Sequence, residues 1–146
     1  NDIHVNNQTK KANKRMYHVR CLSKLRIDSK IIAMFYNAVV SSVLTYAISC
    51  WFTSCTVKER KKVDKFRKKV CKLVTADYRD TIYDVNTIHT KQCLSLLTRI
   101  LKDPSHPLHT FFRFLPSGER LNVTPLKTDR ARNTFVPVAI KLYNQR

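Results

Sequence analysis

The sequence has 146 residues, a length that fits one compact domain with a hydrophobic core of its own. Its 28 Lys and Arg against ten Asp and Glu give a net charge of +18, which favours a polyanionic partner, nucleic acid first and anionic lipid second. The five cysteines are odd in number, irregularly spaced and not preceded by a signal peptide, so we expect reduced thiols in the cytoplasm or nucleus rather than a secreted disulfide framework. Because the chain starts at Asn1 rather than Met, we expect a piece of a longer protein.

The scarcity of turn-forming residues predicts an all-α fold. Gly118 is the single glycine and the five prolines lie between positions 104 and 137, so little in the preceding chain ends a helix. We therefore expect a small bundle of about four to five helices. Residues 1–79 should form a basic helical bundle, and residues 80–146 a helical extension packed on it as one compact unit.

The first predicted helix covers residues 9–25. Apolar residues recur there every three or four positions, from Ala12 to Leu25, while the basic residues lie mostly on other faces. Asp28 or Ser29 can then cap a second helix by accepting hydrogen bonds from free backbone amides of its first turn. The basic residues on the first helix that we expect to contact nucleic acid are Lys10, Lys11, Lys14 and Arg15.

The second predicted helix, 31–52, contains no charged residue. At about 1.5 Å per residue, its 22 residues span roughly 33 Å, enough to cross a bilayer. Small polar side chains recur at every fourth position opposite a broad apolar arc, a pattern found both in buried helices and in membrane spans. The pattern favours a core helix and leaves a membrane anchor with basic flanks as the alternative. The polar stripe consists of Asn37, Ser41, Thr45 and Ser49.

The third predicted helix opens at Thr56-Val57-Lys58-Glu59, which matches a capping box, and runs to about Val74. Between positions 58 and 72, nine basic residues stand against two acidic ones, more charge than in any other segment. Because these charges are nearly all of one sign and a second basic helix lies at 10–26, we expect phosphate contacts rather than a merely solvated face. The expected contacts are Lys58, Arg60, Lys61, Lys62, Lys65, Lys68, Lys69 and Lys72.

The rest of the sequence predicts two further helices joined by an irregular strap. One helix is expected from about residue 80 to Lys102, where Asp103-Pro104 ends it. The other is expected at 134–144, with Pro137 tolerated in the first turn. Four prolines and Gly118 place a Pro-rich strap at 103–128 between them.

Catalytic and metal-binding motifs are missing from the sequence. The acidic residues are single and scattered, so two-metal and glycosidase-like sites lack their ligands, and one glycine cannot form a phosphate-cradling loop. His106 and His109 stand three apart and follow Cys93, but the second ligand pair of a zinc site is lacking. We therefore expect no catalytic residue, metal or cofactor, and no enzymatic activity from this chain alone.

Several stretches of the sequence resemble one known family. KKANKRMYHVRCLSKL, FYNAVVSSVLTYAISCWF, LKDPSHPLHTFFRFLPSGER and NTFVPVAIKLYN follow one another in this order across positions 8–145. They are similar to the region downstream of the polymerase core in reverse transcriptases of LINE-type (non-LTR) retrotransposons, particularly the jockey, CR1 and L2-like elements. The resemblance implies that 10–25, 31–52 and 57–74 form a helical thumb that holds a template–primer duplex, followed by a C-terminal extension. It also implies a parent RNA-directed DNA polymerase whose palm, with its aspartate pair, is not in this sequence.

A shorter resemblance concerns TVKERKKVDKFRKKVCKLV, residues 56–74. This stretch is similar to the basic amino-terminal helix of the AlkB-homologue tRNA-modifying enzymes. It covers only these 19 residues and none of the iron-ligand or methyl-donor motifs, so it implies neither oxidoreductase nor methyltransferase activity. The remaining hypothesis is a non-functional relic of a decayed element, which would neither unfold cooperatively nor bind a duplex.

Overall fold

The computed structural model describes residues 2–146, which are all-α, as the sequence predicts. They form more helices than the four to five expected, because predicted helices are interrupted and short helical turns lie between them. The chain divides into two compact units. Unit 1 consists of Asn1–Ala47 and Cys55–Ile88, and unit 2 of Ile48–Ser54 and His89–Arg146. The chain therefore crosses between the units at three points, and the segment predicted as one helix at 31–52 contributes to both.

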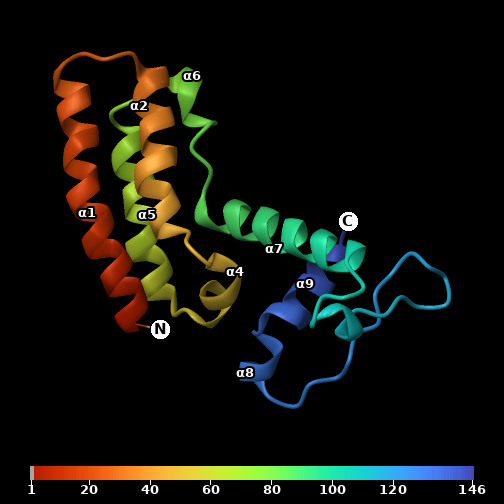
Figure 1. Ribbon diagram of the computed structural model, residues 1–146. Helices are drawn as coiled ribbons and strands as arrows, with labels where there is room; N and C mark the ends of the chain where they lie inside the picture. The colour runs from red at the N-terminus through yellow and green to blue at the C-terminus, as the bar shows by residue number, and fades with distance from the viewer. Residues whose placement is uncertain (1) are drawn as a thin grey trace. The chain divides into compact units, whose positions relative to one another are not determined.

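Unit 1 is built on three neighbouring helical segments, of which the first and third run in the same direction (Figure 1). The first is α1 (Asp2–Lys24), and the third is α5 (Val57–Cys71). Between them in sequence, α2 (Ser29–Phe35) continues through a π-helical segment (Tyr36–Ser41) into α3 (Ser42–Leu44). α1 packs against each of the other segments, so it is the central contact of the bundle.

α1 starts earlier than the predicted position 9 and ends one residue before the predicted position 25. Its end is a Schellman motif, in which the Ile27 amide donates to the Leu22 carbonyl at 3.2 Å and the Arg26 amide to the Ser23 carbonyl at 3.1 Å. Arg26 takes the left-handed conformation, with φ +56°, that this motif requires and that glycine usually supplies. The chain thus turns sharply here without a glycine.

The Asp28 cap predicted for the second helix is confirmed. Its carboxylate accepts from the Lys30 amide at 2.9 Å, which satisfies one of the free amides of the first turn of α2.

The prediction of one continuous helix at 31–52 is wrong. α3 ends at Leu44, a turn follows in which Ala47 has φ +49°, and the chain resumes as α4 (Ile48–Trp51) and a 3-10 turn (Phe52–Ser54) in unit 2. The polar residues contribute to the break, because hydroxyls that bond to carbonyls four residues earlier weaken and often bend a helix. The Ser42 hydroxyl donates to the Ala38 carbonyl at 2.6 Å and the Thr45 hydroxyl to the Ser41 carbonyl at 2.8 Å.

The apolar face of the α2–α3 segment is covered by protein. Ile32, Tyr36, Val40 and Leu44 are each 4% exposed or less, because α1 packs along them. Within residues 2–146, no single helix is long and apolar enough to cross a bilayer. Taken together, the two segments Ser29–Leu44 and Ile48–Ser54, which a turn separates, do pass that test of length and composition.

The capping box predicted at the start of the third helix is confirmed. The Thr56 hydroxyl accepts from the Glu59 amide at 3.3 Å, and the Glu59 carboxylate accepts from the Thr56 amide at 2.6 Å. α5 then buries Val63, Phe66 and Val70 in the bundle and leaves its basic residues outside.

The fourth predicted helix starts later than the predicted residue 80. α6 (Ala76–Arg79) is a separate turn packed on α2, and α7 covers Val85–Lys102. Backbone carbonyls between α6 and α7 accept hydrogen bonds from side chains of the unit 1 helices. The Asn37 amide donates to the Thr81 carbonyl at 3.0 Å, and the Arg67 guanidinium to the Ile82 carbonyl at 2.9 Å. These contacts hold residues 80–84 in a non-helical path along unit 1.

Unit 2 has its own core, in which α7 contributes Leu97 and Ile100. α9 (Phe135–Asn144) matches the helix predicted at 134–144, and it follows the single turn α8 (Asp129–Arg132). Partly buried apolar residues pack around these core residues, and all of them belong to unit 2 itself. The buried members are Leu97, Ile100, Phe112, Leu121, Ala139 and Ile140.

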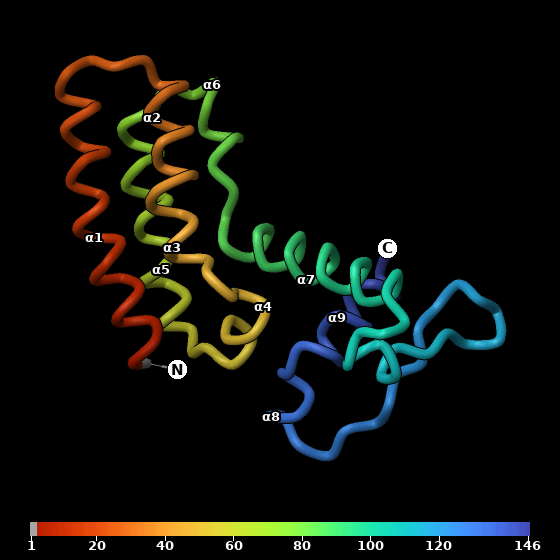
Figure 2. The backbone as a smooth tube through the Cα atoms, in the orientation of Figure 1, coloured from red at the N-terminus to blue at the C-terminus, as the bar shows by residue number. Residues whose placement is uncertain are grey.

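The strap predicted as irregular at 103–128 makes a hairpin-like excursion within unit 2 (Figure 2). It contains a 3-10 turn at His109–Phe111 and an isolated antiparallel bridge between Phe114 and Leu121. The turn between the two bridge residues closes with the Gly118 amide donating to the Leu115 carbonyl at 2.8 Å, and Gly118 has φ +74°. The one glycine of the chain thus stands where the backbone requires a left-handed residue.

Candidate nucleic-acid interface

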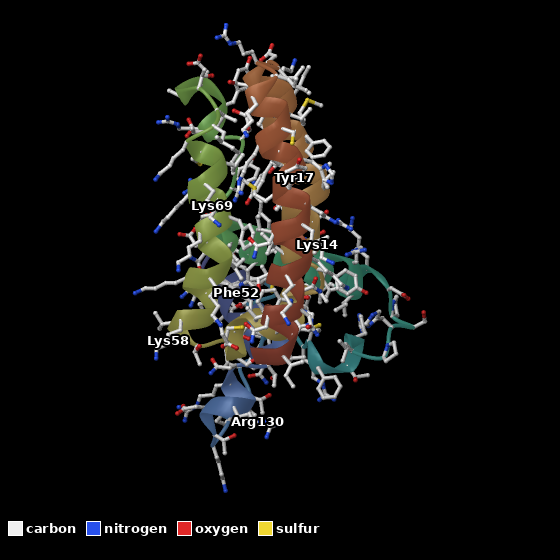
Figure 3. All side chains as sticks on the ribbon, turned by 90° about the vertical axis from the view of Figure 1, so that its left-hand side faces the viewer. Lys14, Tyr17, Phe52, Lys58, Lys69 and Arg130 are labelled. Carbon is white, nitrogen blue, oxygen red and sulfur yellow. The ribbon has the colours of Figure 1, made fainter. Side chains whose placement is uncertain are left out.

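The basic residues of α5 form one continuous exposed stripe, which we call the lysine ridge. At 100° per residue, its members occupy an arc of about 120° on the side of the helix away from the buried Val63 and Val70. Figure 3 shows Lys58 and Lys69 on this helix, with Lys14 and Tyr17 on the neighbouring α1. The lysine ridge consists of seven exposed lysines: Lys58, Lys61, Lys62, Lys65, Lys68, Lys69 and Lys72.

Arg60, which the sequence places with these lysines, lies on a different face of α5. It is half-buried and sits about 160° around the helix from Lys62. Arg67 lies on the same flank as Arg60 and is used inside unit 1, where it holds the Ile82 carbonyl. The two arginines of α5 therefore lie outside the lysine ridge, on a less exposed flank of the helix.

The two acidic residues of α5 compensate little of the charge of the lysine ridge. Lys68 pairs with Asp64 at 3.3 Å, but the two side chains are 70% and 33% exposed, so the pair contributes about 0.5 kcal/mol or less. The other acidic residue of the helix, Glu59, is buried in the capping box. Hydrogen bonding to the backbone of Thr56 lowers the pKa of Glu59. This carboxylate therefore caps the start of α5 as a hydrogen-bond acceptor.

A groove of about 270 Å³ runs between the lysine ridge and α1. At one point along it, the Lys62 ammonium donates to the Asn6 side-chain oxygen at 3.1 Å. At another, the Lys69 ammonium lies 5.4 Å from the centre of the Phe66 ring, within the range of a cation–π contact. The groove therefore combines cations, amides and one aromatic ring. Its lining residues are Asn6, Thr9, Asn13, Lys62, Lys65, Phe66 and Lys69.

The four basic residues predicted on α1 are all exposed, but they do not share one face. By helical periodicity, Lys10 lies beside the groove, four residues after Asn6. Arg15 faces the other side of α1, because its guanidinium donates to the Val39 carbonyl at 2.9 Å. Lys11 and Lys14 lie between these two directions. The fold thus brings Lys10 toward the lysine ridge and turns Arg15 away from it.

Sequence reasoning missed the polar residues of α1 that line the groove. Asn6, Thr9 and Asn13 recur at intervals of three and four, the spacing of one helix face, and that spacing was a usable signal. Tyr17 continues the same face four residues after Asn13 and is 63% exposed, so its ring is available for stacking on a base. Tyr36, in contrast, is 4% exposed and belongs to the core.

The positive charge is shared by both units. Unit 1 holds 18 basic and seven acidic residues, a net charge of +11, and unit 2 holds ten basic and three acidic residues, a net charge of +7. Both units are therefore attracted to a polyanion, and unit 1 carries the denser charge on a single helix.

The titratable side chains do not gather into a metal centre in the part of the chain that the structure describes. Residues 2–146 contain no group of three or more His, Cys, Asp or Glu placed to hold an ion. The nearest arrangement is a buried pair, in which the Cys93 sulfur lies 3.3 Å from Nε2 of His89. Burial raises the pKa of the Cys93 thiol to about 11, so it is protonated near neutral pH and is a poor nucleophile.

No family model, curated protein or solved structure matches this chain significantly.

Proposed function

We propose that this chain binds the phosphate backbone of a nucleic-acid duplex through the lysine ridge, as the clamping region of a LINE-type reverse transcriptase without the polymerase core. The observation that carries the proposal is the ridge itself, seven exposed lysines on one face of α5, of which Lys68 forms an exposed ion pair with Asp64. Each ammonium that meets a phosphate releases condensed counterions, and this release drives binding at moderate salt.

The type of residue on the ridge favours backbone contact over sequence reading. Lysine presents a compact charge on a flexible stem and meets a phosphate as a point charge, whereas base reading usually uses planar, bidentate groups. The asparagines of the neighbouring groove, Asn6 and Asn13, can add hydrogen bonds to phosphate or sugar oxygens without reading the sequence. We therefore expect affinity for RNA or RNA–DNA duplexes that depends little on their sequence.

The assignment to a reverse transcriptase is supported by the resemblance of the sequence stretches described above. α1 packs against the α2–α3 segment and α5, and these elements overlap the three ranges that the resemblance assigns to a thumb, although residues 48–52 of the second range belong to unit 2. In the parent protein the missing palm would supply the polymerase chemistry, and this chain alone would hold the duplex and catalyse nothing. It requires no cofactor for that role, and it would act in the cytoplasm or nucleus.

The proposal is tested by titrating labelled duplexes with the full chain at several salt concentrations. With five to eight phosphate contacts, log affinity should fall against log salt with a slope of about −4 to −7. RNA–DNA hybrid, RNA and DNA duplexes of equal length, each in two unrelated sequences, separate backbone binding from sequence reading. A slope near zero contradicts the proposal, as does binding to one sequence alone.

A membrane anchor is the second candidate, because the bent pair Ser29–Leu44 and Ile48–Ser54 has the length and composition of a broken span. Extraction distinguishes the two functions. An anchored protein stays in the membrane fraction through carbonate and high salt, whereas a duplex clamp leaves it or follows nuclease-sensitive material.

A further inference from the structure

Unit 2 contains a polar groove that the lysine ridge does not include. Its volume is about 460 Å³, within the range of sites that hold small ligands, and it lies along one face of α7. By helical spacing, Lys91, Ser95 and Arg99 stand four residues apart on that face, and Ser49 of α4 forms part of the groove as well. The full lining is Ser49, Lys91, Gln92, Ser95, Leu96 and Arg99.

Ser49 is the residue that makes this groove more than a charged helix face. The residue is only 9% exposed, yet it lines the groove, and its hydroxyl lies 3.9 Å from the Cys50 sulfur. Sulfur is a weak hydrogen-bonding partner, so this contact leaves the hydroxyl with most of its capacity to donate. A largely buried serine that lines a polar groove is suited to offer its hydroxyl to a ligand there.

The remaining lining residues favour an anionic ligand with several acceptor oxygens. Lys91 and Arg99 supply positive charge, while the hydroxyls of Ser49 and Ser95 and the amide of Gln92 supply neutral donors. None of the lining residues is acidic, and the sequence has no Asp or Glu between Val85 and Lys102. A phosphate group matches this donor set, because it accepts from guanidinium, ammonium and hydroxyl groups together.

We propose that this groove of unit 2 is a phosphate-binding subsite, occupied by a backbone phosphate of a bound nucleic acid. The subsite rests on the proposed nucleic-acid binding and deepens it, because it gives the second unit its own contact with the polyanion. Leu96 forms the apolar part of the lining, where the sugar of the same nucleotide can pack. Unit 2 then contributes to affinity through hydrogen-bond donors that converge on one groove, in addition to its net charge.

Charge reversal at Arg99 tests the subsite. Arg99 is exposed, so Arg99→Glu should fold normally, which Trp51 fluorescence in unit 2 can verify. The matched control is Arg130→Glu, an exposed arginine of the same unit outside the groove. We expect Arg99→Glu to weaken duplex binding about tenfold and to lower the salt slope by about 1, with Ser49→Ala weaker in the same direction. Equal effects of Arg99→Glu and Arg130→Glu on affinity and slope would overturn the proposal.

A second measurement separates the sources of the phosphate and the two proposals. Inorganic phosphate is titrated into the ¹⁵N-labelled chain, and shifts of the Ser49, Gln92 and Ser95 amides should saturate in the wild type and vanish in Arg99→Glu. A short duplex should displace the phosphate. If phosphate binds but the duplex does not displace it, the ligand is a small phosphate compound and the nucleic-acid assignment is overturned. If the wild type binds duplex with a steep salt dependence but phosphate shifts none of the groove amides, only the subsite is refuted and the duplex-binding proposal stands.

Discussion

The side-chain amide of Asn144, near the end of α9, pairs with both backbone groups of Leu121. Its oxygen accepts from the Leu121 amide and its nitrogen donates to the Leu121 carbonyl, each at 2.9 Å. Leu121 is fully buried in the core of unit 2 and forms the bridge to Phe114. One asparagine thus replaces a neighbouring strand at this point and ties the strap to the last helix.

Replacing Asn144 by Ala should destabilise unit 2 by about 1–3 kcal/mol, because the partly buried donor and acceptor of Leu121 both lose their partner. Urea unfolding followed by the fluorescence of Trp51, the single tryptophan and a residue of unit 2, measures the loss. Asn144→Asp keeps the acceptor but removes the donor, and should fall between wild type and Asn144→Ala. Gln145→Ala, at an exposed neighbour, is the control, and an equal midpoint for it and Asn144→Ala would refute the pairing.

Replacing Arg26 by Gly should stabilise unit 1 by about 1 kcal/mol. Arg26 adopts φ +56° at the end of α1, a conformation that costs a residue with a Cβ about 1–2 kcal/mol and costs glycine almost nothing. The gain appears as a higher urea midpoint by far-UV circular dichroism. Lys24→Gly, two residues earlier inside the helix, should instead destabilise by up to about 1 kcal/mol. A loss of stability in Arg26→Gly would show that the left-handed turn is wrongly assigned.

Reversing part of the lysine ridge should weaken duplex binding specifically. The variant Lys61→Glu, Lys65→Glu, Lys68→Glu, Lys72→Glu removes four phosphate contacts, so the salt slope should become shallower by about 4. The control reverses four exposed lysines outside the ridge, Lys24, Lys30, Lys102 and Lys127, and changes the net charge equally. If the control loses as much affinity as the ridge variant, binding reflects net charge alone and the ridge has no special role.

The capping box makes the stability of unit 1 depend on pH. Hydrogen bonding to Thr56 lowers the pKa of Glu59, so its contribution is present above the unfolded value of about 4.3 and disappears as pH falls through the lower folded value. Glu59→Gln should therefore be less stable than wild type at pH 7, with the difference shrinking below about pH 4. Urea unfolding at pH 7, 5 and 3 measures it. A difference that is constant across this range would exclude the ionised carboxylate as the source.

The cysteines should separate by their reactivity. Burial is the first cause that raises the pKa of both Cys55 and Cys93 to about 11, so at pH 8 only about one thiol in a thousand is ionised at either site. Cys50 is exposed and should react first with a maleimide. Mass spectrometry after brief labelling measures the order, and Cys50→Ser is the control that removes the fast site. Rapid labelling of Cys93 in the folded chain would contradict its burial.

Local signals in the sequence were sufficient wherever neighbouring residues make the structure. The capping box at Thr56 and Glu59, the cap at Asp28 and the helix that ends at Asn144 were predicted because each depends on residues within a few positions. The break after Leu44 was not predicted, because apolar periodicity continues across it. Hydroxyl bonds to preceding carbonyls weaken the helix before that break, and the segment is divided between the two units there.

The candidate interface likewise combines features that the sequence predicts with features that only the tertiary packing produces. The gathering of the ridge lysines on one face of α5 is a property of the sequence, since seven lysines at this helical spacing share a face in any helix. Which residues stand beside them is a property of the packing. Asn6 and Asn13 lie at the ridge and Arg15 faces away only because α1 packs beside α5 in one register and orientation.

The sequence by itself determined that this protein is helical and strongly basic, because composition and short-range spacing carry that information. The tertiary structure decided the two units, the groove beside the lysine ridge and the second groove at Ser49. Those features depend on contacts between residues tens of positions apart, such as Lys62 with Asn6, Asn37 with Thr81 and Asn144 with Leu121. Helical periodicity fixes the faces of each helix, and long-range packing selects which faces meet.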